Sequence, residues 1–133
     1  MNAIAPKKRP LSSMTPLIMT KDGKPWLAVG AAGGPRIITT VLEIVLSLVD
    51  FHANLQEALD AGRIHHQWLP DEIYWEPNGT NPDTRAALEK MGHKFRAKPN
   101  EHISDANAVM IDPKSGRRIG ASDPRRGGDA VGY

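Results

Sequence analysis

Two glycines and a proline, Gly33-Gly34-Pro35, precede a strongly apolar run at residues 37–51. Glycine adopts backbone conformations that are closed to other residues, and it lets a ligand approach the main chain closely. Proline is tolerated in a first helical turn, because its missing N–H would have no partner there. A helix that begins here presents unpaired amides and the positive end of its dipole to a docking group. The simpler alternative is a tight turn into a core helix.

Two adjacent hydroxyls, Ser12 and Ser13, form a second candidate site in a loop between Pro10 and Pro16. Hydroxyls held by flanking prolines suit a carboxylate as hydrogen-bond donors. As nucleophiles they would need a base within hydrogen-bond reach, which sequence spacing cannot show. Turn capping and simple solvation account for them equally well.

The histidine pair His65-His66 is a weak candidate for metal binding. Neighbouring residues point to opposite faces of a strand and lie about 100° apart on a helix, so the pair cannot easily share one ion. No third ligand stands at the spacing of a known metal motif. We expect no metal site here, and instead histidines that hydrogen-bond the backbone in a loop against Trp68.

Two other polar groups have structural explanations. Thr39 and Thr40 lie inside the apolar run, where threonine hydroxyls bond back to helix carbonyls. The segment Asp123-Pro124-Arg125 resembles a turn with a local ion pair, which contributes little if it is exposed. We therefore expect no nucleophile at either place.

Composition excludes several classes of function. The chain has 133 residues, enough for one domain with a single core. Its 17 basic and 15 acidic residues give a net charge of +2, and the basic residues form no long block, so a nucleic-acid partner is not expected. There is no cysteine, which excludes disulfides, thiolate metal sites and cysteine nucleophiles. No cofactor is indicated, and the apolar run is too short for a membrane span.

Hydrophobic patterning predicts a mixed α/β (α+β) chain with helices layered on an antiparallel sheet. Asp22-Gly23 between two apolar runs is a strong hairpin signal, and Asn54 is a good helix cap. The helix at 37–49 has only a narrow polar stripe and is expected to be buried on most sides. Residues 63–70 read as a loop, and Ala87, Leu88 and Met91 are expected to point inward. We predict helices at 37–49, 55–59 and 80–91, and strands at 17–20, 26–30, 72–76, 93–97, 106–111 and 117–121.

Four segments together resemble one enzyme family. Residues 8–16 look like the serine-pair motif of the gamma-glutamyltranspeptidases, and residues 33–41 resemble the glycine-pair motif of the same family. Residues 63–72 and 120–125 also match, in the same order along the chain. The likeness covers nearly the whole chain, and four motifs in the right order are specific.

The resemblance implies a fold, a chemistry and a set of residue roles. The fold is part of an N-terminal-nucleophile hydrolase αββα sandwich, with residues 1–10 as an extended lead-in and 11–133 as a partial small-subunit domain. Members of the family cut their own precursor and free a threonine, which attacks the gamma-glutamyl amide of glutathione and related compounds. The acyl group then passes to water, an amino acid or a short peptide. Ser12 and Ser13 match the serines that bind the glutamyl alpha-carboxylate, and Gly33 and Gly34 match the oxyanion-hole amides.

The resemblance also implies partners and a location. The catalytic threonine of the family, and further substrate contacts, correspond to a segment upstream of Met1, and no threonine here has the nucleophile's sequence context. The large subunit, which contributes an arginine to glutamate binding, is a second expected partner. Family members are exported, which implies a periplasmic or extracellular location, although the chain carries no signal. Ala31-Ala32 stand where many relatives carry Ser-Pro, and no function is assigned to residues 101–107.

Two expectations about the isolated chain follow. Without a nucleophile it should be catalytically inert, and uncovered sheet edges and apolar surface should make it oligomerise or aggregate. Three alternatives stay open: a related acylase acting on beta-lactam side chains, a non-catalytic module that binds a small carboxylate or a partner chain, and a truncated gene product. The enzymatic interpretation requires that the hydroxyls of Ser12 and Ser13 converge with the amides of Gly33 and Gly34 on one small pocket for an anion.

Overall fold

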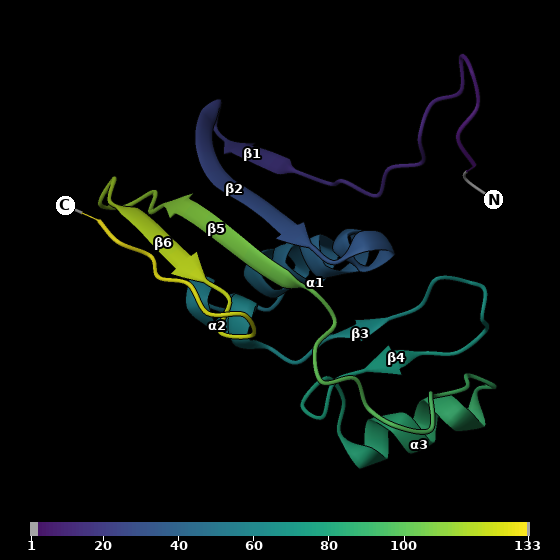
Figure 1. Cartoon of the computed structure of the whole chain (residues 1–133). Coiled ribbons are helices and arrows are strands. Elements are labelled where there is room, and N and C mark those ends of the chain that lie inside the picture. Colours follow the sequence, from purple (N-terminus) through teal and green to yellow (C-terminus); the bar gives the residue numbers. More distant parts are fainter. Residues whose placement is uncertain (1–2, 133) are drawn as a thin grey trace.

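The centre of the fold is a four-stranded antiparallel sheet with the strand order β1-β2-β5-β6 (Figure 1). The computed structural model describes residues 3–132, so Met1 and Asn2 of the expected lead-in, and Tyr133, lie outside the description. The strands of the sheet are β1 (Leu17–Lys21), β2 (Lys24–Ala32), β5 (Asp105–Ile111) and β6 (Arg118–Ser122). The hairpin predicted at Asp22-Gly23 is confirmed, and the strands predicted at 106–111 and 117–121 pair with each other as neighbours.

The turn between β1 and β2 forms as its sequence predicts. Asp22 and Gly23 have φ angles of 51° and 75°, and a two-residue hairpin loop of the type I′ kind needs positive φ at both positions. The register that follows pairs Leu17 with Val29 and Ile18 with Ala28. Because the strands are antiparallel, β1 begins at the end of the sheet where β2 stops.

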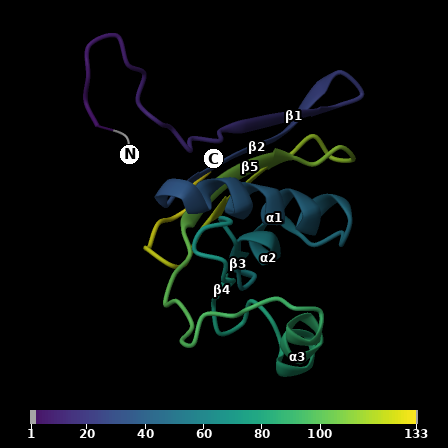
Figure 2. The same ribbon diagram turned by 90° about the vertical axis from the view of Figure 1, so that its right-hand side faces the viewer.

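Two helices cover one face of the sheet, and the core lies between the two layers (Figure 2). After the short 3₁₀ turn η1 (Gly34–Arg36) comes α1 (Ile37–Val49), followed by α2 (Leu55–Asp60). Asn54 caps α2 in a full capping box with Glu57, as its type predicts. The buried side chains of this core are Leu27 and Val29 of β2, Ile37, Val41, Ile44 and Leu48 of α1, Leu55, Ala58 and Leu59 of α2, and Ala106, Ala108 and Ala121 of β5 and β6.

The expectation that α1 is buried on most sides is wrong. Its core side faces the sheet, but the apolar side chains of Ile38 and Leu42 are both 52% exposed, and Leu46 and Val49 are exposed as well. The polar stripe of the helix, in contrast, turns toward the rest of the chain: Thr39 contacts His65, and Glu43 contacts Ile64. Within the described residues, therefore, one apolar face of α1 has no cover.

The remaining elements form a small unit beside the sheet: β3 (Ile64–His65), β4 (Tyr74–Trp75) and α3 (Pro82–Lys90). The sequence predicts a loop or an irregular segment at residues 63–70, but Ile64 and His65 form β3 and pair with β4. The prediction of a strand at 93–97 is wrong. In this segment the structure has one isolated parallel bridge, between Ile73 and Phe95.

The inward face expected for α3 is also wrong. The helix has no buried residue, Ala87 and Met91 are exposed, and Leu88 is only half-buried. The physical reason is position: α3 lies apart from the sheet and its core, so the described residues offer it little apolar surface (Figure 2). Among those residues no helix is long and apolar enough to cross a membrane.

Candidate active site

The glycine turn joins β2 to α1. Gly33 and Gly34 have φ angles of 153° and 61°, which favour glycine, and Pro35 lies in η1 rather than in the first turn of α1. A Cβ atom on Gly33 would lie 2.8 Å from Ser104 Oγ, whereas a Cβ on Gly34 would have no neighbour within 4 Å. Neither amide N–H donates a hydrogen bond to another described residue. The turn therefore leaves two backbone donors free at the start of a helix.

The serine pair lies just before β1. Ser12 is exposed and its Oγ accepts a hydrogen bond from the Met14 N–H at 3.2 Å. Ser13 is half-buried, and its carbonyl accepts a hydrogen bond from the Thr15 hydroxyl at 3.0 Å. Figure 1 shows the lead-in entering the sheet at the end where β2 runs into η1. The serine and glycine pairs thus lie at one end of the β1–β2 hairpin.

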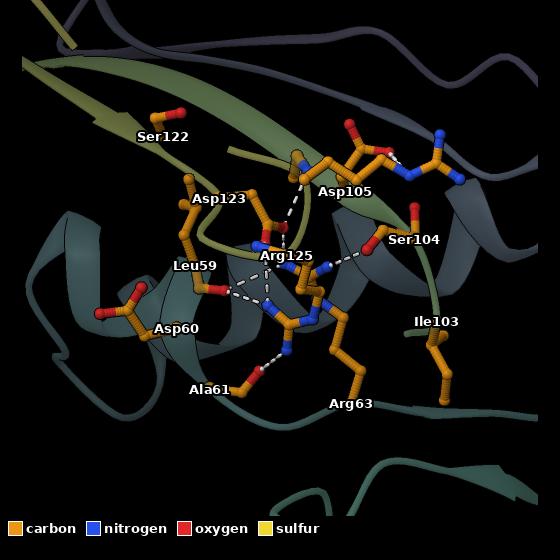
Figure 3. A network of polar contacts seen from close by, with 12 residues as sticks. Leu59, Asp60, Ala61, Arg63, Ile103, Ser104, Asp105, Ser122, Asp123 and Arg125 are labelled. Carbon is orange, nitrogen blue, oxygen red and sulfur yellow. Dashed lines mark hydrogen bonds and ion pairs between the residues drawn. The ribbon is translucent and has the colours of Figure 1, made fainter. Parts of the chain in front are cut away.

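A buried ionic network that sequence reasoning missed joins distant segments of the described chain (Figure 3). Arg63 Nη2 donates to Asp123 Oδ2 at 2.7 Å, and both side chains are only 2% exposed. Arg125 also contacts Asp123, at 3.0 Å. The local ion pair expected at 123–125 exists, but it is buried and joined to a partner 60 residues away. No local pattern marks Arg63 as that partner.

Glu76 completes the network by a two-point contact with Arg125. Arg125 Nε donates to Glu76 Oε1 at 2.9 Å, and Nη2 donates to Oε2 at 2.6 Å. This fork geometry is the strong form of an arginine–carboxylate pair. Burial raises the pKa of Glu76, but hydrogen bonds from Arg125 and from the Ile103 N–H outweigh it and hold that pKa below its ordinary value.

The network bonds to the backbone of several segments. Arg63 and Arg125 both donate to the Leu59 carbonyl, and Arg125 also donates to Ala61. These carbonyls belong to the end of α2, where helix geometry leaves them without intrahelical partners. Asp123 accepts the Ala106 N–H at 2.9 Å. The network therefore holds α2, β5 and the segment after β6 together, which is a structural role.

Glu43 differs from the network because it is half-buried and one of its carboxylate oxygens is buried without a partner in the described chain. Burial raises its pKa to about 7, and the Ile64 N–H bond together with the charge of Arg63 offsets only part of that rise. Its Oε1 accepts the Ile64 N–H at 3.0 Å, while Oε2 has no partner in the part of the chain that is described. Near neutral pH this carboxyl carries its charge only part of the time.

The histidine and threonine predictions are confirmed in part. His66 accepts the Trp68 N–H, as expected for a loop histidine. His65 differs, because it is buried and its ring nitrogens lie 2.8 Å from Thr39 Oγ1 and 3.1 Å from Gln67 Oε1. Thr39 does bond back to the Arg36 carbonyl, but Thr40 is buried with no partner among the described residues. Residues 3–132 contain no cluster of three histidine or acidic side chains that could hold a metal ion.

Solved structures define the class of protein. An acivicin-inhibited gamma-glutamyltranspeptidase superposes with a TM-score of 0.86 at 46% identity, over 94% of this chain and 66% of that chain. A gamma-glutamyltranspeptidase mutant from Helicobacter pylori gives 0.84 at 44% identity, over 93% and 67%. A cephalosporin acylase from Bacillus halodurans gives 0.71 at 28% identity, over 80% and 20%. The chain has the α+β architecture of the N-terminal-nucleophile hydrolases, as expected.

The sequence comparisons narrow the class to one family. Residues 1–133 match the family model described as gamma-glutamyltranspeptidase. The chain is 50% identical over 133 residues to the glutathione hydrolase proenzyme of Escherichia coli (strain K12), covering 99% of this chain and 22% of that protein. It is 38% identical to the proenzyme of Bacillus subtilis (strain 168), covering 98% and 22%. The chain belongs to the gamma-glutamyltranspeptidase family, and it spans about a fifth of these two relatives.

The buried carboxylate of Asp123 should make stability depend on pH. Burial raises its pKa, but hydrogen bonds from the Arg125 N–H and from Arg63 outweigh it and lower that pKa below its ordinary value. A lowered folded pKa adds stability above the unfolded value of about 3.9, and this stability is lost as the pH falls through the folded pKa. Asp123→Asn should lower the free energy of unfolding at pH 7 by about 3–5 kcal/mol, because it leaves buried arginines uncompensated.

Urea unfolding between pH 7 and pH 3 measures both effects. Wild type should lose stability below about pH 4, and Asp123→Asn should lose less over the same interval. Asp129→Asn, at an exposed position, is the matched control and should follow wild type. Equal stability of all three proteins at pH 7 would contradict a stabilising network.

Glu43 should have the opposite pH dependence. Its folded pKa is raised from 4.5 to about 7, so its contribution to stability falls as the pH rises through that interval. Glu43→Gln keeps an acceptor for the Ile64 N–H but removes the buried charge. The variant should unfold with a free energy higher than wild type by about 1–3 kcal/mol at pH 8, and by little at pH 5. Glu89→Gln, at an exposed position on α3, is the control and should be as stable as wild type. A Glu43→Gln variant that is less stable than wild type at pH 8 would refute this account.

Proposed function

We propose that this chain supplies two parts of a gamma-glutamyltranspeptidase active site. The hydroxyls of Ser12 and Ser13 bind the alpha-carboxylate of the glutamyl group. The amides of Gly33 and Gly34 form an oxyanion hole for the tetrahedral intermediate at the gamma-carbonyl. The reaction is transfer or hydrolysis of the gamma-glutamyl group of glutathione or a related compound.

The observation that carries the proposal is the register of the β1–β2 hairpin. The ladder begins with the pair of Leu17 and Val29, followed by Ile18 with Ala28. Ser13 lies four residues before Leu17, and Gly33 lies four residues after Val29, so the serine and glycine pairs leave the ladder at the same end of the hairpin. A substrate with an alpha-carboxylate and a gamma-carbonyl could reach both pairs.

The state of the glycine amides supports the oxyanion role. Both N–H groups are without an acceptor among the described residues, and they precede a helix of 13 residues whose dipole favours negative charge. A Cβ atom on Gly34 would have no neighbour within 4 Å, so that side of the residue is open. Removing one such donor from an enzyme typically costs about 3–4 kcal/mol of transition-state stabilisation.

The relatives support the substrate class. The Escherichia coli and Bacillus subtilis relatives are both named glutathione hydrolase proenzymes, and this chain is 50% and 38% identical to them. By resemblance, a threonine outside this chain is the nucleophile and a large subunit completes the glutamate site. The resemblance also extends a periplasmic or extracellular location to the protein that carries this chain.

A beta-lactam side-chain acylase is the second candidate, because a cephalosporin acylase shares the fold with a TM-score of 0.71. A glutaryl group carries a carboxylate at the same distance from the scissile amide as a gamma-glutamyl group, and the two groups differ by the alpha-amino group of the glutamyl substrate. The serine pair therefore suits the carboxylate of either substrate. Rates of hydrolysis of glutathione and of a glutaryl amide by the complete enzyme separate the two.

The uncovered surfaces support a requirement for partner segments. The open face of the sheet exposes Ile18 at 75% and Val109 at 49%, and strands β1 and β6 are the sheet's edges. Together with the exposed side of α1, these surfaces would be covered by the large subunit and the upstream segment. Antiparallel sheets in layered folds bury their apolar faces against another layer.

The isolated chain should therefore oligomerise or aggregate, as measured by light scattering across a concentration series. Leu42→Lys places a charge in the exposed apolar face of α1 and should reduce association. Thr84→Lys adds the same charge on exposed α3 and should not. A stable, well-dispersed wild-type monomer would contradict the need for partner segments.

The serine pair gives the direct test of the function. In the complete enzyme, Ser12→Ala and Ser13→Ala should each raise KM for a gamma-glutamyl anilide by about 10- to 100-fold, because a hydrogen bond to a charged group contributes about 1.5–3 kcal/mol. Ser115→Ala, in the exposed turn between β5 and β6, is the control and should leave KM unchanged. Unaltered KM in both serine variants would refute the carboxylate role.

The isolated 133-residue chain should turn over the anilide no faster than buffer does.

A further inference from the structure

Ser104 is held in an unusual backbone conformation beside the glycine turn. Its φ angle is 135°, in the region that residues with a side chain rarely adopt, and its side chain is nearly buried. Such a conformation is unfavourable and persists only where the surroundings enforce it. Residues 101–107 carried no predicted function, so the sequence alone did not single out this position.

The surroundings that enforce it are the ionic network. The Ile103 N–H donates to Glu76 Oε1 at 2.7 Å, and Arg63 Nη1 donates to the Ser104 carbonyl at 2.9 Å. Figure 3 shows the guanidinium of Arg63 reaching that carbonyl. On the other side, the Ala106 N–H donates to Asp123 Oδ2. Backbone groups on both sides of the Ser104 φ and ψ angles are thus anchored to buried charges.

The side chain of Ser104 acts on the glycine turn. Its hydroxyl donates to the Ala32 carbonyl at 2.6 Å. The last pair of the β2–β5 ladder joins Ala32 to Asp105, so Ser104 lies one residue outside the ladder. A Cβ atom on Gly33 would lie 3.0 Å from Ser104 Cβ, so the two residues pack closely. Ser104 therefore contacts the chain at the point where it leaves β2.

The bonded carbonyl and the Gly33 amide belong to one peptide group. A peptide group is planar and trans, so its C=O and N–H point in opposite directions. A hydrogen bond that holds the Ala32 carbonyl toward Ser104 consequently directs the Gly33 N–H away from Ser104. Hydrogen bonding at the carbonyl also polarises the peptide and strengthens its N–H as a donor.

We propose that Ser104 is a positioning residue for the oxyanion hole. It orients the Gly33 amide through the Ala32–Gly33 peptide plane, and it is itself held by Arg63 and Glu76. The inference rests on the proposed function of Gly33 and Gly34, and it adds a residue that neither contacts substrate nor belongs to the four motifs. Without the hydroxyl, the peptide plane can rotate, because glycine permits the compensating backbone angles.

The test uses the complete enzyme with Ser104→Ala and Ser104→Gly. Both variants lack the hydroxyl, so kcat for a gamma-glutamyl anilide should fall at least about 10-fold, toward the loss of roughly 100- to 1,000-fold seen when a donor is removed outright. KM should change less than about twofold, because ground-state binding through the serine pair is intact. Affinity for a tetrahedral boronate analogue should fall with kcat, while affinity for free glutamate should not. Ser115→Ala is the matched control.

The two substitutions separate positioning from stability. Glycine accepts a positive φ without strain, so Ser104→Gly relieves strain that Ser104→Ala retains. A merely structural role predicts that activity follows the melting temperature, whereas positioning predicts a similar loss of kcat in both variants. Wild-type kcat in Ser104→Ala, or a change in KM alone, would overturn the proposal.

The result is distinguishable from a failure of the proposed function. If the serine-pair variants raise KM while Ser104→Ala keeps kcat, the site stands and the positioning role is wrong. If the serine-pair variants leave KM unchanged, the proposed site itself is wrong. Should a Ser104 variant not mature, the crystal structure of its uncleaved precursor replaces kinetics: in Ser104→Ala the Ala32–Gly33 peptide plane should be rotated from its wild-type orientation, and the peptide before Gly92 should be unchanged. An unrotated Ala32–Gly33 peptide would refute the proposal.

Discussion

The constraint on which the rest of this structure depends is the burial of two arginines with two carboxylates. Arg63, Glu76, Asp123 and Arg125 have side chains between 2% and 8% exposed. A charge removed from water must be compensated by an opposite charge and by hydrogen bonds, and here the guanidinium groups also satisfy carbonyls at the end of α2. Buried pairs add little net stability when compared with apolar packing. What this network provides is one defined arrangement of segments that are far apart in the sequence.

That arrangement reaches the glycine turn through a short series of contacts. Arg63 holds the Ser104 carbonyl, and Ser104 holds the Ala32 carbonyl next to Gly33. In an oxyanion hole the benefit comes from donors that already point at the developing charge before the reaction begins. Under the proposed role of Ser104, the network of residues 63, 76, 123 and 125 determines the direction of the amide at residue 33. The network itself has a structural role, and its contribution to the proposed chemistry is indirect.

Two apolar surfaces of the described residues are exposed to solvent. The apolar side of α1 and the open face of the sheet are exposed, while the polar stripe of α1 faces inward on His65 and Ile64. An exposed apolar helix face beside an open sheet face is unfavourable in water. This agrees with a chain that spans about a fifth of its Escherichia coli and Bacillus subtilis relatives. Partner segments would bury these surfaces and, by resemblance, bring the nucleophile to the serine and glycine pairs.

The sequence by itself determined the local elements and the family. Asp22-Gly23 predicts the first hairpin because the turn's backbone angles depend on those two residues alone, and Asn54 predicts the start of α2 for the same reason. The motifs around Ser12 and Gly33 indicated the family, which the comparisons confirm. Only the tertiary structure decided that Asp123 is buried, that residues 64–65 form a strand, and that Ser104 has a positive φ. These features depend on partners 9 to 72 residues away, from the His65–Tyr74 pair to the Ser104–Ala32 contact, and contacts at such distances leave no local pattern in a sequence.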